Sequence, residues 1–191
     1  MKCLQYSWEE ILKFCEELAN KIKKSGYRPD VIVAIARGGW IPARILCDHL
    51  NIKELYSIKT EHWGIVATKT GEARITQPLN VKLENKKVLV VDDVADTGET
   101  VKLVLDHVKS FSPEDVKIAV IDYKRTSGFV PDYYVNFIEE WKWVVYPWSL
   151  REDVKDLLKD KKFNLKEAME YLKSLDLKVS EEIVRDVLSD M

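Results

Sequence analysis

The chain has 191 residues, enough for one domain of ordinary size and short of two. Hydrophobic residues make up 46% and charged residues 32%, a composition typical of a globular protein with a core and not of a disordered chain. Thirty Lys and Arg residues nearly balance 32 Asp and Glu residues. The chain therefore has no overall positive field that would attract nucleic acid or an anionic membrane.

The sequence predicts a cytoplasmic protein. No apolar run approaches the roughly 18 residues of a membrane helix, and the N-terminal residues lack the pattern of a signal peptide. Cys3, Cys15 and Cys47 are widely spaced and form no CxxC pair, which is typical of free thiols in a reducing compartment. Two Gln against 23 Lys is a bias of heat-adapted proteomes.

Helix and strand patterns alternate in the first half of the chain. Ser7 and Glu10 form a capping box in front of apolar residues at helical spacing. The apolar, β-branched run 31–36 is typical of a strand that is buried on both faces. The predicted elements are, in order, a helix over 8–24, a strand over 31–36, a helix over 41–50, and strands over 55–63 and 74–81 that pair in an irregular hairpin.

The second half continues this alternation as far as about residue 150. Residues 86–108 are predicted to form a strand, a loop of acids, Thr and Gly, and a helix. A strand follows over 116–125, and the aromatic segment 141–148 contains a short last one. Beyond it, helices are predicted to begin at 149–152, 164–167 and 180–183.

Strands that alternate with helices predict an α/β fold with a parallel sheet and helices on both faces. We expect a main domain over 1–150 and a helical C-terminal extension over 151–191. In such sheets, ligands bind beyond the carboxyl ends of the strands. Three strand ends carry unusual chemistry, at 37–39, 92–100 and 122–125, and they are expected to converge on one site.

The segment 88–100 is the most informative motif. Its apolar strand runs directly into Asp92 and Asp93, and adjacent carboxylates suit a pair of hydroxyl groups or a divalent cation. Thr97 to Thr100 then opens a helix, whose free N–H groups and dipole can bind a phosphate. An ordinary strand-to-helix turn with an N-cap is the structural alternative.

This segment resembles the ribose-phosphate motif of the type I phosphoribosyltransferases, which bind phosphoribosyl pyrophosphate (PRPP). The resemblance implies that Asp92 and Asp93 hold the ribose hydroxyls and help to place Mg²⁺, with Asp93 as the metal ligand. It also implies that Asp96 acts as the general base. The loop around the 5′-phosphate would comprise Asp96, Thr97, Gly98, Glu99 and Thr100.

A second resemblance concerns pyrophosphate. Arg37, Gly38 and Gly39 follow a strand and are similar to the pyrophosphate loop of the same family. Glycine lets the backbone approach an anion, and the Arg37 guanidinium offers a planar fork for phosphate oxygens. Arg74 lies where relatives carry a basic residue that reaches pyrophosphate from a small hood, expected over about 55–85 and 125–148.

A third resemblance, to bacterial xanthine-guanine phosphoribosyltransferases, concerns the base. It covers Lys124, the stretch 131–135, and Trp143 placed four residues before a Pro-Trp pair. It implies that the Lys124 ammonium donates to the 6-oxo group, that the Trp143 ring stacks on the purine, and that the Val144 carbonyl accepts from the base edge. Where those enzymes carry an acidic residue, this chain has Val145.

The resemblance thus implies transfer of ribose 5-phosphate from PRPP to guanine, hypoxanthine or xanthine, with release of pyrophosphate and a nucleotide product. It also implies a homodimer or homotetramer that binds neither nucleic acid nor membrane. Two alternatives stay open: a PRPP-sensing regulator of the same fold, and an adenine phosphoribosyltransferase. Lys124 argues against adenine, because an ammonium group meets no acceptor on a 6-amino group.

Overall fold

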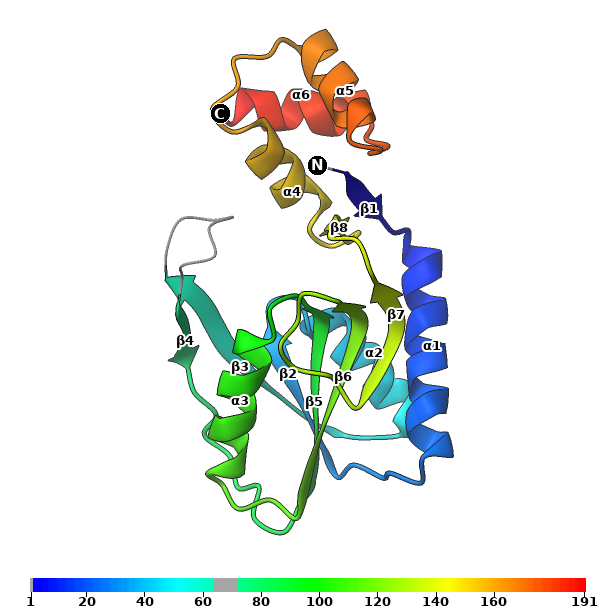
Figure 1. Ribbon diagram of the computed structural model, residues 1–191, viewed down its shortest axis with the longest axis vertical. Coiled ribbons are helices and arrows are strands. Elements are labelled where there is room, and N and C mark those ends of the chain that lie inside the picture. Colours follow the sequence, from blue (N-terminus) through cyan, green and yellow to red (C-terminus); the bar gives the residue numbers. More distant parts are fainter. Residues whose placement is uncertain (1, 64–71) are drawn as a thin grey trace. The chain divides into compact units, whose positions relative to one another are not determined.

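The computed structural model describes residues 2–63 and 72–191 and divides the chain into two compact units (Figure 1). The larger unit comprises Leu12–Trp141, and the smaller unit joins Met1–Ile11 to Lys142–Met191. The chain thus leaves the larger unit at Trp141, ahead of the boundary predicted at residue 150. In the part of the chain that the structure describes, no helix is both long and apolar enough to cross a bilayer.

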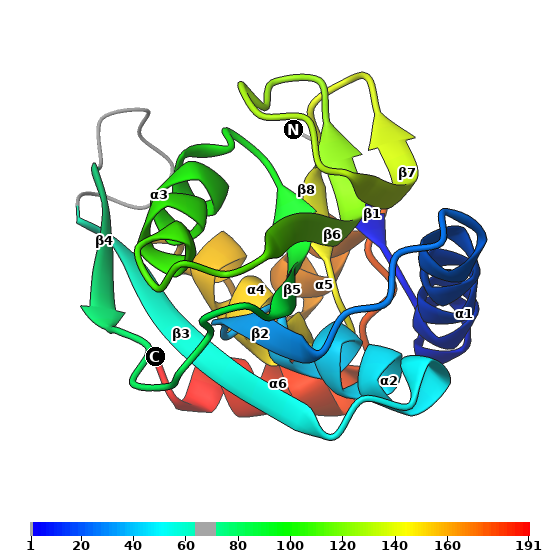
Figure 2. The ribbon, with the colours of Figure 1, turned by 90° about the horizontal axis from the view of Figure 1, so that it is seen from below.

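The larger unit is built on a six-stranded sheet with the order β4-β3-β2-β5-β6-β7 (Figure 2). Neighbouring strands are parallel except β3 and β4, which form the predicted antiparallel hairpin. The predicted parallel α/β fold is therefore confirmed. Its strands are β2 (Val31–Ala36), β3 (Glu54–Trp63), β4 (Glu72–Gln77), β5 (Lys87–Ala95), β6 (Asp115–Lys124) and β7 (Tyr133–Ile138).

Helices cover both faces of the sheet (Figure 2). One face packs against α3 (Glu99–Lys109), and the other packs against α1 (Trp8–Lys24) and α2 (Trp40–Leu50). Side chains of β2 alternate between the two cores, with Val33 on the α3 side and Ile32 on the opposite side. All six residues of β2 are buried, as its continuous apolar run predicted.

β5 extends beyond the strand that the sequence predicted. Asp92 and Asp93 were expected in a loop, but they belong to the strand, which continues to Ala95. The reason is β6, which runs parallel beside β5 and pairs Asp92 with Val120 and Ala95 with Tyr123. The acidic pair is therefore held by the hydrogen-bond ladder of a central strand.

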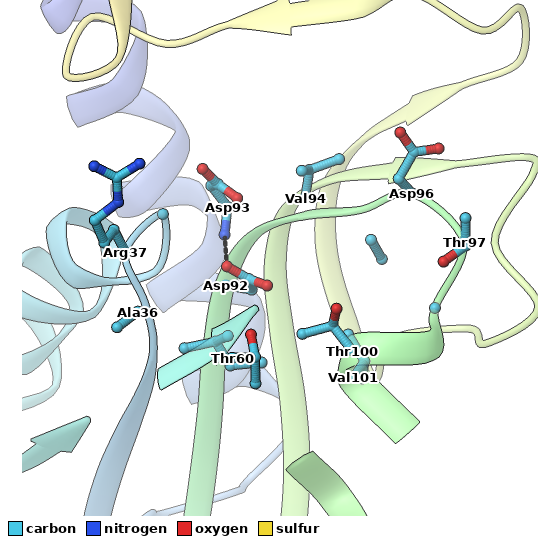
Figure 3. Close-up of a pocket in the computed structure, with 14 residues that line it drawn as sticks. Ala36, Arg37, Thr60, Asp92, Asp93, Val94, Asp96, Thr97, Thr100 and Val101 are labelled. Atoms are coloured by element: carbon cyan, nitrogen blue, oxygen red, sulfur yellow. Dashed lines mark hydrogen bonds between the residues drawn. The ribbon is translucent and has the colours of Figure 1, made fainter. Parts of the chain in front are cut away.

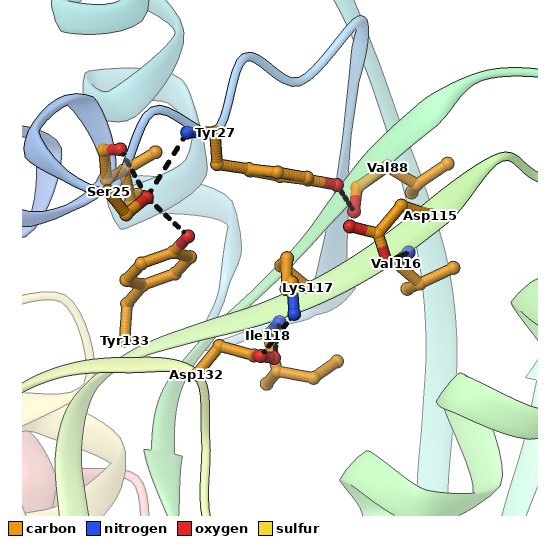
Figure 4. A network of polar contacts seen from close by, with 10 residues as sticks. Ser25, Tyr27, Val88, Asp115, Val116, Lys117, Ile118, Asp132 and Tyr133 are labelled. Atoms are coloured by element: carbon orange, nitrogen blue, oxygen red, sulfur yellow. Dashed lines mark hydrogen bonds and ion pairs between the residues drawn. The ribbon is translucent and has the colours of Figure 1, made fainter.

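β7 is an edge strand that the sequence analysis did not identify, and it lies in the segment predicted as part of a hood. It begins just after Asp132, which accepts a hydrogen bond from the Ile118 backbone N–H at 2.8 Å and pairs with the Lys117 ammonium at 3.1 Å (Figure 4). Asp132 therefore fixes the start of β7 near the start of β6. Six residues of strand, roughly 20 Å, separate Ile118 from Lys124, so Asp132 has a structural role away from any site at Lys124.

The smaller unit combines two short strands with three helices. β1 and β8 pair in parallel, with Leu4 opposite Val144. The N-caps match the predicted helix starts: Asn164 forms a full capping box with Glu167, and Ser180 accepts from the Ile183 N–H. Its elements are β1 (Cys3–Gln5), β8 (Trp143–Val145), α4 (Leu150–Leu158), α5 (Leu165–Ser174) and α6 (Glu181–Ser189).

Candidate functional site

A cavity of about 210 Å³ lies at the carboxyl ends of β2 and β5 in the larger unit (Figure 3). The end of β2, the end of β5 and the first turn of α3 meet there, as expected for a parallel sheet. Two of the three predicted strand ends therefore line one site. The lining residues are Ile35, Ala36, Arg37, Gly38, Thr60, Asp92, Asp93, Val94, Ala95, Asp96, Thr97, Gly98, Thr100 and Val101.

Asp92 and Asp93 give the cavity an acidic wall. The Asp93 backbone N–H donates to the Asp92 carboxylate at 3.0 Å. Burial raises the pKa of Asp92 well above its ordinary value, and the negative charge of Asp93 adds to the rise. Burial also raises the pKa of Asp93 to about 6, with a contribution from the charge of Asp122 on β6. Two buried, adjacent carboxylates with raised pKa values favour a ligand that brings positive charge or hydroxyl donors.

The turn after β2 packs directly against these carboxylates. A Cβ atom on Gly38 would overlap the Asp93 carboxylate, and one on Gly39 would overlap the backbone carbonyl of Val91 in β5. The glycines are therefore required for close contact between the turn and β5, in addition to any approach of an anion. Arg37 is exposed and lines the same cavity (Figure 3).

A tight glycine turn joins β5 to α3 at the cavity. Gly98 caps α3 with a φ of 82°, a left-handed conformation that favours glycine. The loop that follows β6 holds this turn in place, because the Gly128 N–H donates to the Thr97 carbonyl at 2.8 Å. A Cβ on Gly98 would lie 2.8 Å from the Ser127 hydroxyl oxygen and 2.9 Å from Phe129. The 11-residue helix α3 thus begins at the cavity, with its first N–H groups outside the helix's own hydrogen-bond ladder and the Glu99 N–H 3.4 Å from the Thr97 hydroxyl.

Asp96 joins the third predicted strand end to the cavity. Lys124, the last residue of β6, is only 3% exposed, and its ammonium lies 2.7 Å from Asp96 Oδ2. Lys124 is therefore a buried lysine with a charged partner and not an ordinary surface lysine. Thr126 Oγ1 donates to Asp96 Oδ1 at 3.1 Å, and the Trp141 indole N–H donates to both carboxylate oxygens.

Trp143 and Val144 belong to the smaller unit. The Trp143 indole N–H donates to Asp153 Oδ1 at 2.9 Å, and the Ser149 hydroxyl donates to Asp153 Oδ2 at 2.6 Å. Burial raises the pKa of Asp153 above its ordinary value. The Trp143 N–H and the Val145 carbonyl both bond β1, so alternation along β8 directs the Val144 carbonyl away from β1. The roles of Trp143 and Val144 toward a purine stay predictions.

Several site residues differ from what the sequence predicted. Arg74 lies on β4 with an exposed side chain and is absent from the residues that line the cavity, so its pyrophosphate role stays a prediction. Thr60 of β3 does line the cavity, although no motif contains it. Thr126 and Trp141 were also missed, because both lie next to residues that the resemblance had already matched.

This geometry places an acidic pair, an Arg-Gly turn and the start of a helix around one cavity of an α/β protein. Residues 6–154 match the family model described as phosphoribosyl transferase domain. Because that match covers most of the chain, the chain belongs to the phosphoribosyltransferase family, and its fold is the type I fold.

Individual relatives agree with this family. A xanthine-guanine phosphoribosyltransferase of Idiomarina loihiensis is 27% identical over 147 residues, which cover 75% of this chain and 85% of the relative. A hypoxanthine-guanine phosphoribosyltransferase of Streptococcus mutans is 26% identical over 175 residues, covering 81% and 96%. The crystal structure of a purine phosphoribosyltransferase from Pyrococcus horikoshii has a TM-score of 0.68 and 36% identity, covering 78% of this chain and 95% of that one.

Proposed function

We propose that the protein is a magnesium-dependent purine phosphoribosyltransferase that transfers ribose 5-phosphate from PRPP to a 6-oxopurine base and releases pyrophosphate. The observation that carries the proposal is the shared cavity, which the acidic pair, the start of α3 and the Arg37 turn line together. Asp96 also lines it and pairs with Lys124. The names of the relatives, which include xanthine, guanine and hypoxanthine, support a purine base as acceptor.

In this proposal PRPP lies along the cavity, between the turn that precedes α3 and Arg37. Its 5′-phosphate binds the turn from Thr97 to Thr100, where helix N–H groups and threonine hydroxyls donate to phosphate oxygens. Its ribose hydroxyls donate to Asp92 and Asp93. Its pyrophosphate lies toward Arg37, whose guanidinium can contact two phosphate oxygens at once.

The residues of the cavity fit Mg²⁺ bound together with its substrate. Among residues 2–63 and 72–191, no group of three or more His, Cys, Asp or Glu side chains could hold a metal alone. Mg²⁺ is commonly held by one or two carboxylates together with substrate phosphates, so Asp93, beside Asp92, suffices as the protein's share. When bound, the ion would offset the negative charge of the departing pyrophosphate.

The chemical step follows from the charges around the anomeric carbon. The bond from C1 to the pyrophosphate oxygen loosens before N9 of the base bonds to C1, so the ribose gains oxocarbenium character, and pyrophosphate leaves as the new bond forms. Arg37 stabilises the charge that develops on pyrophosphate. Asp96 accepts the proton from N7 of the base, as a general base within reach of the cavity.

Recognition of the base rests on Lys124. Its ammonium, held by Asp96 in the protein without ligand, can donate a further hydrogen bond to the 6-oxo oxygen, because an ammonium has three donors. The Val144 carbonyl is directed away from β1 within the smaller unit; it is the resemblance that assigns it to the base edge and assigns the Trp143 ring to the face of the purine. Val145 is fully buried in the smaller unit and offers no polar group for the 2-position.

The proposal is tested by supplying PRPP with guanine, hypoxanthine, xanthine or adenine and following pyrophosphate release. We expect turnover with one or more 6-oxopurines, and loss on the order of 100-fold or more in Asp93→Asn. Asp106→Asn, on the exposed surface of α3, is the matched control and should retain activity. PRPP binding without turnover of any base, together with a DNA gel shift, would favour the regulatory alternative instead.

A further inference from the structure

Trp141 is a tryptophan outside the recognised motifs that contacts the proposed general base. Its indole N–H lies 3.2 Å from Asp96 Oδ1 and 3.3 Å from Asp96 Oδ2, a bond shared between both oxygens. The ammonium of Lys124 lies 4.6 Å from the centre of the same ring. Trp141 therefore contacts both side chains to which base chemistry was assigned.

These contacts bring three donor groups to the Asp96 carboxylate, whose side chain is 37% exposed. A carboxylate has about four acceptor positions, two on each oxygen. Oδ1 accepts from Thr126 and Trp141, while Oδ2 accepts from Lys124 and Trp141. The single indole N–H is shared by the two oxygens and therefore lies between them. To take the proton from N7, Asp96 must accept a hydrogen bond from the base, and a base that donates at this position takes the place of the indole.

Trp141 is the donor that can leave at the lowest cost. Lys124 is 3% exposed and bonds Asp96 through a charged contact at 2.7 Å. Thr126 also bonds the Asp96 backbone carbonyl at 2.9 Å, which ties its hydroxyl to the loop. Trp141 is 45% exposed, is neutral and makes the longest contacts, so its indole can move into water without creating a buried charge.

We propose that the Trp141 indole N–H occupies, in the protein without base, the hydrogen-bonding position on Asp96 that the N7–H group of the purine takes during catalysis. An indole and a purine are both flat, fused bicyclic rings with an N–H on the five-membered ring, so one can replace the other at the carboxylate. Trp141 thereby keeps Asp96 oriented, and binding of the base displaces it. This inference rests on the proposed function.

The first test is steady-state kinetics of Trp141→Phe, which keeps an aromatic ring over Lys124 but removes the N–H. Because the base no longer competes with the indole, KM for the base should fall by about three- to tenfold, the range of one net hydrogen bond. KM for PRPP should not change. Trp8→Phe, an equally exposed tryptophan of the smaller unit, is the matched control and should leave both constants unchanged. An unchanged KM for the base in Trp141→Phe would overturn the proposal. A raised KM would also overturn it, because it would show that Trp141 contributes to binding of the base by stacking.

The second test observes the hydrogen bond directly. The indole resonances of protein labelled with ¹⁵N-tryptophan are recorded, and the peak missing in Trp141→Phe is assigned to Trp141. Adding base with pyrophosphate should shift this peak toward the position of a water-exposed indole, and a peak that stays in place would refute displacement. Asp96→Asn distinguishes a failure of this inference from a failure of the proposed general base. If it is inactive while Trp141→Phe behaves like wild type, only this inference fails; if it retains full turnover, the proposed general base fails.

Discussion

Lys124→Met is the substitution that best separates recognition of the base from orientation of Asp96. Methionine keeps the apolar stem of a side chain that is 4% exposed and removes only the ammonium. Two contacts are lost together: the 2.7 Å pair with Asp96 and the proposed bond to the 6-oxo group. The first concerns every base, whereas the second concerns 6-oxopurines alone.

The expected magnitude follows from the burial of the ammonium. A hydrogen bond to a charged group contributes about 1.5–3 kcal/mol, and the loss of that contribution lowers kcat/KM by roughly 10- to 150-fold. We expect this factor in the ratio of guanine or hypoxanthine to adenine. A looser Asp96 adds a decrease that is common to all bases and cancels in the ratio.

The assay measures kcat/KM for guanine, hypoxanthine and adenine in wild type and Lys124→Met. Arg125→Met is the matched control, because it removes the neighbouring charge from an exposed pair with Glu139 that should contribute little. If Lys124→Met lowers all three values by one common factor, the lysine acts only on Asp96. The assignment of a 6-oxopurine would then lose its main support.

Three further predictions concern other parts of the molecule. Arg37→Ala should weaken PRPP and pyrophosphate by about tenfold or more but leave the nucleotide product nearly unaffected, since only the first two carry a pyrophosphate; calorimetric titration measures all three. Gly38→Ala should raise KM for PRPP by about 10- to 100-fold, because the added methyl group displaces the Asp93 carboxylate. Burial raises the pKa of Asp153 above 3.8, so the folded state binds this proton more tightly than the unfolded chain. The free energy of unfolding should therefore fall as pH rises from about 4 through the raised pKa, and Asp153→Asn should remove that decline in urea titrations.

Each of these predictions has a result that contradicts it. Equal losses for PRPP, pyrophosphate and nucleotide in Arg37→Ala would remove the pyrophosphate assignment. Wild-type kinetics in Gly38→Ala would mean that the turn can move away from β5. Its control is Gly128→Ala, because a Cβ there meets only the flexible end of Lys102 at 3.3 Å and the Thr97 carbonyl at 3.6 Å. A decline in stability that persists in Asp153→Asn would assign it to another group.

Features carried by contiguous residues were predictable from the sequence. The run 31–36 is apolar at every position, and a strand buried on both faces is its only satisfactory environment. The capping box at Ser7 and the helix start at 164–167 were identified for the same reason, because the residues that cap each helix lie within one helical turn. The segment 88–100 likewise holds carboxylates, glycine and threonines in one strand-to-helix turn.

Features that depend on a neighbouring strand were not predictable in this way. The acidic pair was expected in a loop, and only the presence of β6 extends β5 to Ala95. β7 was missed because its residues become a strand through pairing with β6, which Asp132 fixes from outside the strand. The short strands β1 and β8 pair with each other although they lie far apart in the sequence, and only β8 was predicted, within the segment 141–148.

The surroundings of Asp96 separate what the sequence predicts from what only the tertiary structure decides. The sequence determined the chemistry of this residue: a carboxylate that follows a buried strand and precedes a turn predicted to bind phosphate. The partners of Asp96 come from positions 28 to 45 residues further along the chain, in Lys124, Thr126 and Trp141. Only the tertiary structure decides them, because the register that sets Ala95 beside Tyr123 brings the next residues of β5 and β6 together. That register is fixed by packing on both faces of the sheet, which no local pattern records.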